Sequence, residues 1–231
     1  MPRSARLLVA GGHYHVINRG NNRSQVFESP CEYQSFLSLI GQAQARIQLS
    51  ILAACLMPNH FHLVVSQASR TDISRWMHWL LTTHTHHHHL RRGSSGRVWQ
   101  GRFKAFAIER DDHLLTVMRY VERNPVRAGL VTRAENWPWG SLAWRRADRV
   151  GNELSAPTVT LPTDWFERVN APQTSEDLAA LRKCVNGQKP FGSDAWADDP
   201  SRQPALMGPI RRRGRPRKVV GGAAGEPAEN Q

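Results

Sequence analysis

The amino-acid sequence predicts an α+β fold built on a single antiparallel sheet. Two observations predict it: short segments in which apolar and polar residues alternate, and longer segments in which apolar residues recur every three to four positions. Along the chain these segments run strand, helix, strand, strand, helix, strand, and a third helix follows. The first six have the order of a ferredoxin-like βαββαβ unit, so we expect its helices on one face of the sheet.

Alternating segments define the strands. The four predicted strands span residues 13–19, 49–57, 60–66 and 98–108. The first is followed by Gly20 and two asparagines, which favour a turn. Only Pro58 and Asn59 separate the second strand from the third, so these two strands are predicted to form a hairpin.

Capping residues mark where the helices begin. The predicted starting positions are Ser29 followed by Pro30, Thr71 or Asp72, and Asp111 or Asp112. The third helix runs into Asn124 and Pro125. Because a residue that precedes proline is disfavoured in a helix, we expect this helix to end or kink there.

The composition points to a polyanionic partner. Lys and Arg number 31 against 19 Asp and Glu, the formal net charge is +12, and the sequence pI is about 10.9. A balance of this sign favours nucleic acid. The sequence has no apolar run long enough to span a membrane. Its three cysteines are far apart and fit free thiols in a reducing cytosol.

The chain is predicted to have three parts. Residues 1–147 carry the alternating elements and form the predicted catalytic domain. Residues 148–200 are richer in Pro, Asp, Ser and Gly and form a partly helical extension. Residues 201–231 have almost no periodic apolar pattern and are expected to be a disordered basic tail.

Two histidines lie two positions apart in the third predicted strand. Side chains alternate across a strand, so His60 and His62 share one face while Phe61 faces the core. Two convergent imidazoles suit a divalent metal ion. The alternative is two ordinary polar residues on an exposed sheet face.

One tyrosine and one asparagine share a face of the third predicted helix. Asn124 is four residues after Tyr120, so its amide oxygen could complete a metal site begun by the histidines. Tyrosine has an ordinary pKa of about 10 and needs a metal, a base or an activated electrophile to act as a nucleophile. The alternative is a half-buried tyrosine whose hydroxyl finds a hydrogen-bond partner.

Basic residues surround these positions. Candidate DNA-binding residues are Arg19, Arg23, Arg102, Lys104, Arg123, Arg127, Arg211, Arg212, Arg213, Arg215, Arg217 and Lys218. The tail motif RGRPRK resembles an AT-hook, whose arginines enter the minor groove, but a generic polybasic tail explains it equally well. The histidines at positions 84 and 86–89 cannot all bind one ion, because they point in different directions on a helix. We expect a helix surface near DNA there, with incidental affinity for nickel or zinc.

Several segments together resemble the REP-associated tyrosine transposases, single-tyrosine relatives of the small HUH-endonuclease transposases of bacterial insertion sequences. These segments are YHVINRGNNR, MPNHFHLVV, VWQGRFKAF and RYVERNPVRAGLV, and WPWGSLAW and RGRPRK are also similar. The resemblance extends from about Gly11 to Lys218. The histidine run departs from the pattern of arginines and aromatic residues expected of the family at that place.

The resemblance implies a site and a chemistry. His60 and His62 match the HUH metal ligands, Tyr120 the nucleophile, and Asn124 the third ligand, with Mg²⁺ or Mn²⁺ as the ion. It implies that the tyrosine cleaves single-stranded DNA, leaving a 5′-phosphotyrosyl intermediate and a free 3′-hydroxyl. The implied substrate is a hairpin of a repetitive extragenic palindrome with a guide tetranucleotide. The implied setting is a bacterial cytoplasm, associated with the nucleoid, as a monomer or homodimer.

Two other functions fit parts of the sequence. A catalytically silent protein that binds DNA hairpins and regulates them would not require histidines, tyrosine and asparagine together. A rolling-circle initiator or relaxase shares the metal and tyrosine chemistry, but such proteins often carry a second active-site tyrosine or a helicase domain.

Overall fold

The sheet has four strands, and its topology confirms the predicted fold. The computed structural model describes residues 8–147, 154–187 and 189–198. The strands are β1 (His13–Arg19), β2 (Ser50–Met57), β3 (His60–Ser66) and β4 (Lys104–Ile108). Their order is β2-β3-β1-β4, and all neighbours pair antiparallel. This is the ferredoxin-like arrangement expected from the order of the elements.

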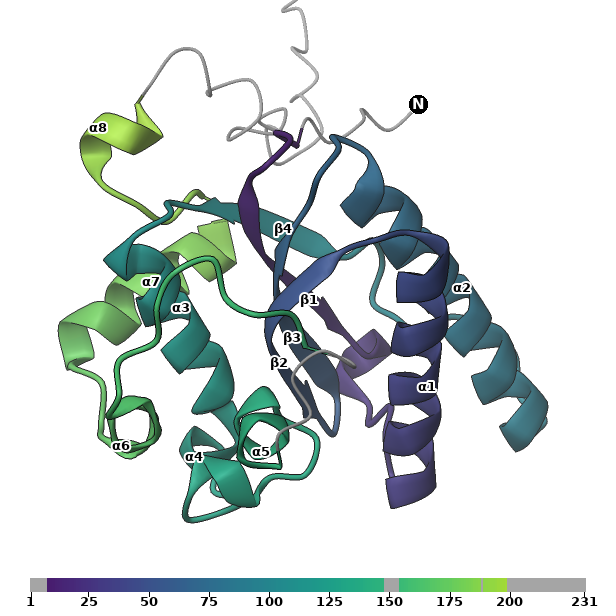
Figure 1. The fold of residues 1–231 in the computed structure, drawn as a ribbon. Helices are drawn as coiled ribbons and strands as arrows, with labels where there is room; N and C mark the ends of the chain where they lie inside the picture. The colour runs from purple at the N-terminus through teal and green to yellow at the C-terminus, as the bar shows by residue number, and fades with distance from the viewer. Residues whose placement is uncertain (1–7, 148–153, 188, 199–231) are drawn as a thin grey trace, which may run out of the picture.

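Two long helices cover one face of the sheet (Figure 1). They are α1 (Pro30–Arg46) and α2 (Asp72–Arg92). A capping box between Ser29 and Glu32, with Pro30 in the first turn, sets the start of α1. Gly93, with a φ of 56°, ends α2 in the left-handed conformation that glycine adopts without strain. Both starts agree with the prediction.

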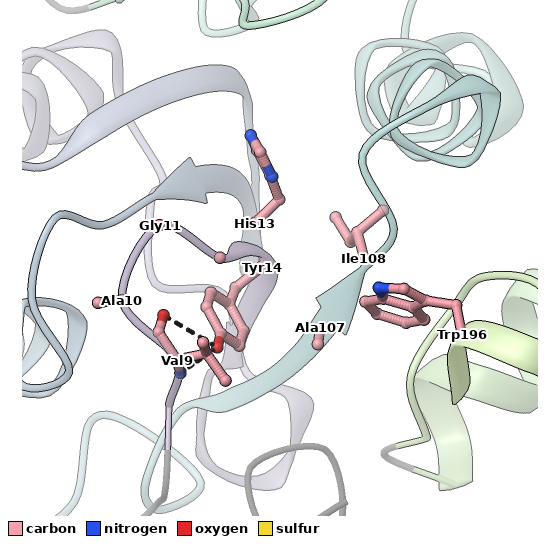
Figure 2. A pocket seen from close by; sticks show the side chains of 9 residues that line it. Val9, Ala10, Gly11, His13, Tyr14, Ala107, Ile108 and Trp196 are labelled. Carbon is pink, nitrogen blue, oxygen red and sulfur yellow. Dashed lines mark hydrogen bonds between the residues drawn. The ribbon is translucent and has the colours of Figure 1, made fainter. Parts of the chain in front are cut away.

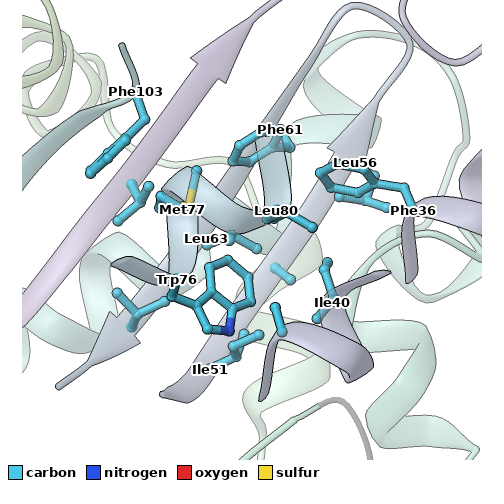
Figure 3. Close-up of a cluster of buried hydrophobic side chains, with 14 of the residues drawn as sticks. Phe36, Ile40, Ile51, Leu56, Phe61, Leu63, Trp76, Met77, Leu80 and Phe103 are labelled. Atoms are coloured by element: carbon cyan, nitrogen blue, oxygen red, sulfur yellow. The ribbon is translucent and has the colours of Figure 1, made fainter. Parts of the chain in front are cut away.

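Alternate residues of each strand point to this face and pack under the two helices. Phe61, the residue between the two histidines, is fully buried on this side, as predicted. Figure 3 shows this cluster, which includes Phe36, Ile40, Ile51, Leu56, Phe61, Leu63, Trp76, Met77, Leu80 and Phe103. The burial of large side chains from both layers stabilises the sheet against the helices.

The last strand is shorter than the sequence predicts. Only residues 104–108 form β4, whereas residues 98–108 were expected; before it, Trp99 makes an isolated bridge with Gly20. Val98 and Trp99 are consecutive and both buried in the same core. A regular strand would point one of them away, so the packing of both side chains excludes strand geometry there.

A third helix covers the opposite face of the sheet. Helix α3 (Asp112–Glu122) begins where Asp111 accepts a hydrogen bond from the His113 amide. It ends at Arg123, and a short helix, α4 (Asn124–Arg127), follows. Pro125 has no amide hydrogen to donate to the carbonyl four residues earlier. The Asn124 side chain replaces that bond: its Nδ2 donates to the carbonyls of Tyr120 and Val121, at 3.1 and 3.2 Å. The predicted break is confirmed.

The other elements in the described ranges are also helices. They are η1 (Asn21–Arg23), η2 (Ala134–Asn136), α5 (Ser141–Arg146), α6 (Trp165–Asn170), α7 (Ser175–Gly187) and α8 (Asp194–Ala197). Trp165, Val169 and Leu181 are buried in the same core as α3. The predicted boundary at residue 147 stays a prediction, and the predicted tail, 201–231, lies outside the described residues. No helix in the described ranges is both long enough and apolar enough to cross a membrane.

A buried carboxylate joins α3 to α5 and α6. Glu122 accepts hydrogen bonds from Ser141 Oγ, Arg145 Nε and Trp165 Nε1, at 2.6, 3.0 and 2.7 Å. Glu122→Ala would leave the buried guanidinium of Arg145 without its carboxylate partner. We expect the free energy of unfolding in urea to fall by about 3–5 kcal/mol. Glu122→Gln, which keeps an acceptor oxygen, should lose less; equal losses would contradict this explanation.

Candidate active site

The two histidines of β3 lie at the end of the sheet next to the turn formed by Pro58 and Asn59. Their ring centroids are 4.9 Å apart, and both rings lie on the face that α3 covers. His62 is 3% exposed and His60 is half-buried. The predicted alternation is therefore correct. The face is not an open surface, however, because α3 packs over it.

A third histidine joins this pair. His15 of β1 is buried, and its Nε2 lies 2.8 Å from His62 Nδ1. The hydrogen bond occupies one nitrogen of His62 and leaves Nε2 as the nitrogen available to an ion. The strand pattern did not single out His15, which was predicted only as part of the first strand, residues 13–19. The one available signal was the repeated His-x-His spacing of residues 13 and 15, because the pairing of β1 with β3 is not visible in the sequence.

Burial and nearby arginines keep these imidazoles neutral. Burial lowers the pKa of His15 to about 3, and the positive charge of Arg127 adds to the effect. Burial, Arg19 and Arg127 lower the pKa of His60 to about 4. The pKa of His62 is lowered well below its usual value, first by burial and then by the neighbouring histidines and arginines. A metal ion binds the neutral form of imidazole, so no proton has to leave near pH 7.

Tyr120 lies against the histidines from α3. Its ring centroid is 6.0 Å from that of His62 and 6.1 Å from that of His15, with both pairs close to perpendicular. The guanidinium carbon of Arg127 lies 4.1 Å from the centroid of the Tyr120 ring. Among the residues that the structure describes, none is hydrogen-bonded to the Tyr120 hydroxyl. This tyrosine therefore differs from a structural one whose hydroxyl is satisfied.

The Asn124 side chain is oriented by its own helix. Both of its hydrogen bonds from Nδ2 go to backbone carbonyls, so Oδ1 is left for another partner. Arg127 Nη2 donates to this oxygen. Tyr120 and Asn124 are both buried and lie on one face, as the spacing predicted.

The donor set suits a divalent cation. Two neutral imidazoles and one amide oxygen are nitrogen and oxygen ligands that divalent metal ions accept, and His62 has the hydrogen-bonded second nitrogen typical of metal-ligating histidines. Another group, Glu109, Asp111 and His113, has potential ligand atoms within 4.8 Å of one another. Its members are engaged elsewhere: Asp111 caps α3, and Glu109 accepts from the Ser193 amide. This second group lies outside the set that adjoins Tyr120.

Four of the predicted basic residues lie at or near the same end of the sheet. Arg19 pairs with His60 across β1 and β3, and Lys104 pairs with Ile17. Arg23 adjoins the turn before β3, since Asn59 donates to its carbonyl, and Arg102 is exposed just before β4. Residues 211–218, with the AT-hook-like motif, lie outside the described residues.

Arg123 was predicted to bind DNA, but in the structure its guanidinium contacts the protein backbone. Its Nη1 donates to the carbonyls of Val169 and Asn170 at the end of α6. A guanidinium bound to backbone carbonyls of a neighbouring helix anchors that helix against α3. A DNA-binding role for Arg123 therefore has no support from its position, whereas Arg127 lies directly at Tyr120.

The histidine run is not a uniform helix surface. His86 and His87 are exposed, but His84 is 6% exposed and packs against Phe36 and Trp99, with ring centroids 5.0 and 5.3 Å away. His89 bonds to Ser94 Oγ and the Gly96 carbonyl at the end of α2. The prediction of a surface is therefore wrong for His84.

Burial of His84 makes stability depend on pH. Burial lowers its pKa from 6.5 to about 3, so between these values the unfolded chain binds more protons. The stabilisation is complete above pH 6.5 and decreases by up to about 1.4 kcal/mol for each unit as the pH falls towards 3. His84→Leu should weaken this dependence in urea unfolding curves between about pH 7 and pH 5. The exposed His86→Gln should keep it; identical slopes for all three proteins would contradict the expectation.

A small cavity lies at the opposite end of the sheet. Its volume is about 240 Å³, and its lining includes Val9, Gly11, Tyr14, Ile108 and Trp196 (Figure 2). His13 opens β1 and pairs with Ser66, whereas His60 pairs with Arg19 at the other end of the same strands. The cavity therefore lies apart from Tyr120 and the two β3 histidines.

Comparison with known proteins gives consistent matches. Residues 9–124 match the model of the family described as Transposase IS200 like. A REP-associated tyrosine transposase of Escherichia coli (strain K12) is 26% identical over 140 residues, which cover 59% of this chain and 80% of that protein. A solved structure described as a REP-associated tyrosine transposase bound to a REP hairpin has a TM-score of 0.54 at 22% identity. That match covers 76% of this chain and all of the other, and it shows a shared fold.

Proposed function

The chain belongs to the Transposase IS200 like family, and on this basis we propose that it is a metal-dependent single-strand DNA endonuclease and strand transferase. The observation that carries the proposal is the position of Tyr120. It lies beside His62 and Arg127, and no described residue bonds to its hydroxyl. The set of candidate site residues suits phosphodiester cleavage better than DNA binding alone. This set is His60, His62, Tyr120 and Asn124.

The proposed reaction exchanges one phosphate ester for another. The Tyr120 hydroxyl gives its proton to solvent water and the oxygen attacks the scissile phosphorus, forming a tyrosine O–P bond. The P–O3′ bond breaks, and the departing 3′-oxygen takes a proton from solvent water to become a hydroxyl. The DNA is left joined to Tyr120 through its 5′-phosphate. Attack by a 3′-hydroxyl reverses the step, so rejoining needs no ATP.

His60, His62 and Asn124 would hold the divalent ion. When bound, it would neutralise charge on the phosphate oxygens and orient the ester. The chain's own residues supply the positioning: α3 holds Tyr120 against the histidine-bearing strands, and His15 fixes the ring of His62. Because Tyr120 adjoins the histidines of its own chain, we propose that it attacks DNA bound to the same subunit.

The proposed substrate is a DNA hairpin with an adjoining single strand. A relative of the same fold was solved with a REP hairpin. Arg19, Arg23, Arg102 and Lys104 would contact its phosphates, and the tail, residues 211–218, would add salt-sensitive affinity. We propose that a protein acting on such a substrate works in the cytoplasm, at the nucleoid.

Formation of a covalent adduct tests this function. The purified protein is incubated with Mn²⁺ and a 5′-labelled or 3′-labelled hairpin from repeats that flank its gene. We expect a denaturation-resistant complex only with the 3′ label, because the tyrosine keeps the 5′-phosphate of the downstream strand. Binding without any adduct would instead indicate a silent regulatory protein. Cleavage of substrates with no hairpin would favour an initiator or relaxase.

A further inference from the structure

Arg127 is a partly buried cation without an acidic partner. Its guanidinium lies over the Tyr120 ring, and its Nη2 donates to Asn124 Oδ1. Its Nη1 is buried and has no hydrogen-bond acceptor. Among the described residues, no carboxylate forms an ion pair with Arg127. A cation removed from water is normally paired, so this arrangement lacks an anion.

The surroundings of Arg127 add further positive charge. Arg19 pairs with His60 across the sheet, and its Nε is also buried without an acceptor. The positive charges of Arg127 and Arg19 both act on the two β3 histidines, and Arg182 of α7 acts on Arg127. Two unsatisfied guanidinium donors near one histidine pair form a site suited to a phosphate group.

The bond between Arg127 and Asn124 bears on the metal site. Asn124 Oδ1 is the amide oxygen that would bind the divalent ion, and in this structure it accepts from Arg127. A guanidinium donor and a divalent cation repel each other at one oxygen. The ion can therefore take Oδ1 readily only when Arg127 turns to another acceptor.

We propose that Arg127 is a catalytic residue that binds the scissile phosphate of the DNA and releases Asn124 Oδ1 to the divalent ion as it does so. This proposal rests on the proposed function and adds a role for a residue outside the histidine, tyrosine and asparagine set. DNA phosphate and ion then strengthen each other's binding, because the phosphate removes the competitor for Oδ1.

The first test measures adduct formation in a single turnover with a labelled hairpin and saturating Mn²⁺. Arg127→Met should slow the reaction by about 100-fold or more, the usual effect of losing one donor to a developing charge. Arg127→Lys should recover part of the rate. The control is Arg75→Met, which removes the same charge from an exposed position on α2, across the sheet, and should react at the wild-type rate.

The second test needs no catalysis. Mn²⁺ binding to the DNA-free proteins is followed by electron paramagnetic resonance, after thermal melts confirm that the variants are folded. Arg127→Met should bind Mn²⁺ more tightly than wild type and Arg75→Met, by about tenfold, because a competing cation is gone. A wild-type adduct rate in Arg127→Met, or unchanged Mn²⁺ affinity, would overturn the inference. If wild type itself forms no adduct, the proposed function fails. The comparison of Mn²⁺ affinities then still tests whether Arg127 competes with the ion for Asn124 Oδ1.

Discussion

Tyr120→Phe is expected to abolish the covalent protein–DNA adduct and DNA cleavage while hairpin binding survives. The substitution removes one oxygen. It keeps the ring that packs perpendicular to His15 and His62 and lies beneath Arg127. No described residue would lose a hydrogen bond to that hydroxyl, so the fold should be unchanged. Loss of the nucleophile should lower the cleavage rate by at least about 10⁴-fold.

Denaturing gels measure the adduct, and filter binding of the same labelled hairpin measures affinity. We expect the dissociation constant of Tyr120→Phe to stay within about twofold of wild type. Tyr33→Phe is the matched control: Tyr33 is also buried, but on α1, where it stacks on Trp139 at 4.8 Å, across the sheet from the site. That variant should cleave normally. Cleavage by Tyr120→Phe would assign the nucleophile to another group.

Replacement of His60 and His62 by Ala is expected to remove divalent-ion binding and, with it, cleavage. Two of the three proposed ligands disappear, so affinity for Mn²⁺ should fall by more than about 100-fold. Added Mn²⁺ should therefore not restore the adduct. Calorimetric titration of the DNA-free protein with Mn²⁺ measures the binding, separately from activity.

Stability has to be separated from metal binding in this experiment. His62→Ala opens a cavity and leaves His15 Nε2 without its partner, so the double variant is expected to melt at a lower temperature. The single variant His60→Ala changes only a half-buried position and should keep its fold, so it separates loss of metal binding from loss of stability. His13→Ala removes a buried histidine from the same face at the far end of β1, and it should keep full Mn²⁺ affinity. Equal affinity in wild type and His60→Ala would exclude His60 as a ligand.

Local patterns in the sequence were enough to predict much of the fold and part of the site. The order of the elements predicted the sheet, because alternation and helical spacing arise within a few residues of the chain. The same rule placed His60 and His62 on one face and Phe61 on the other. Asn124 before Pro125 predicted the helix break, since the restriction lies between neighbouring residues.

The tertiary structure decided what lies against these residues. The bond between His15 and His62 depends on the register of β1 against β3, and the burial of both depends on α3 packing over that face. Arg123 and Arg127 are four residues apart, yet one anchors α6 and the other covers Tyr120. The burial of His84 and the shortened β4 likewise follow from packing around Trp99. Except for the contact between Arg127 and Tyr120, these contacts join residues well separated in the chain, where neither periodicity nor local backbone preference carries information about partners.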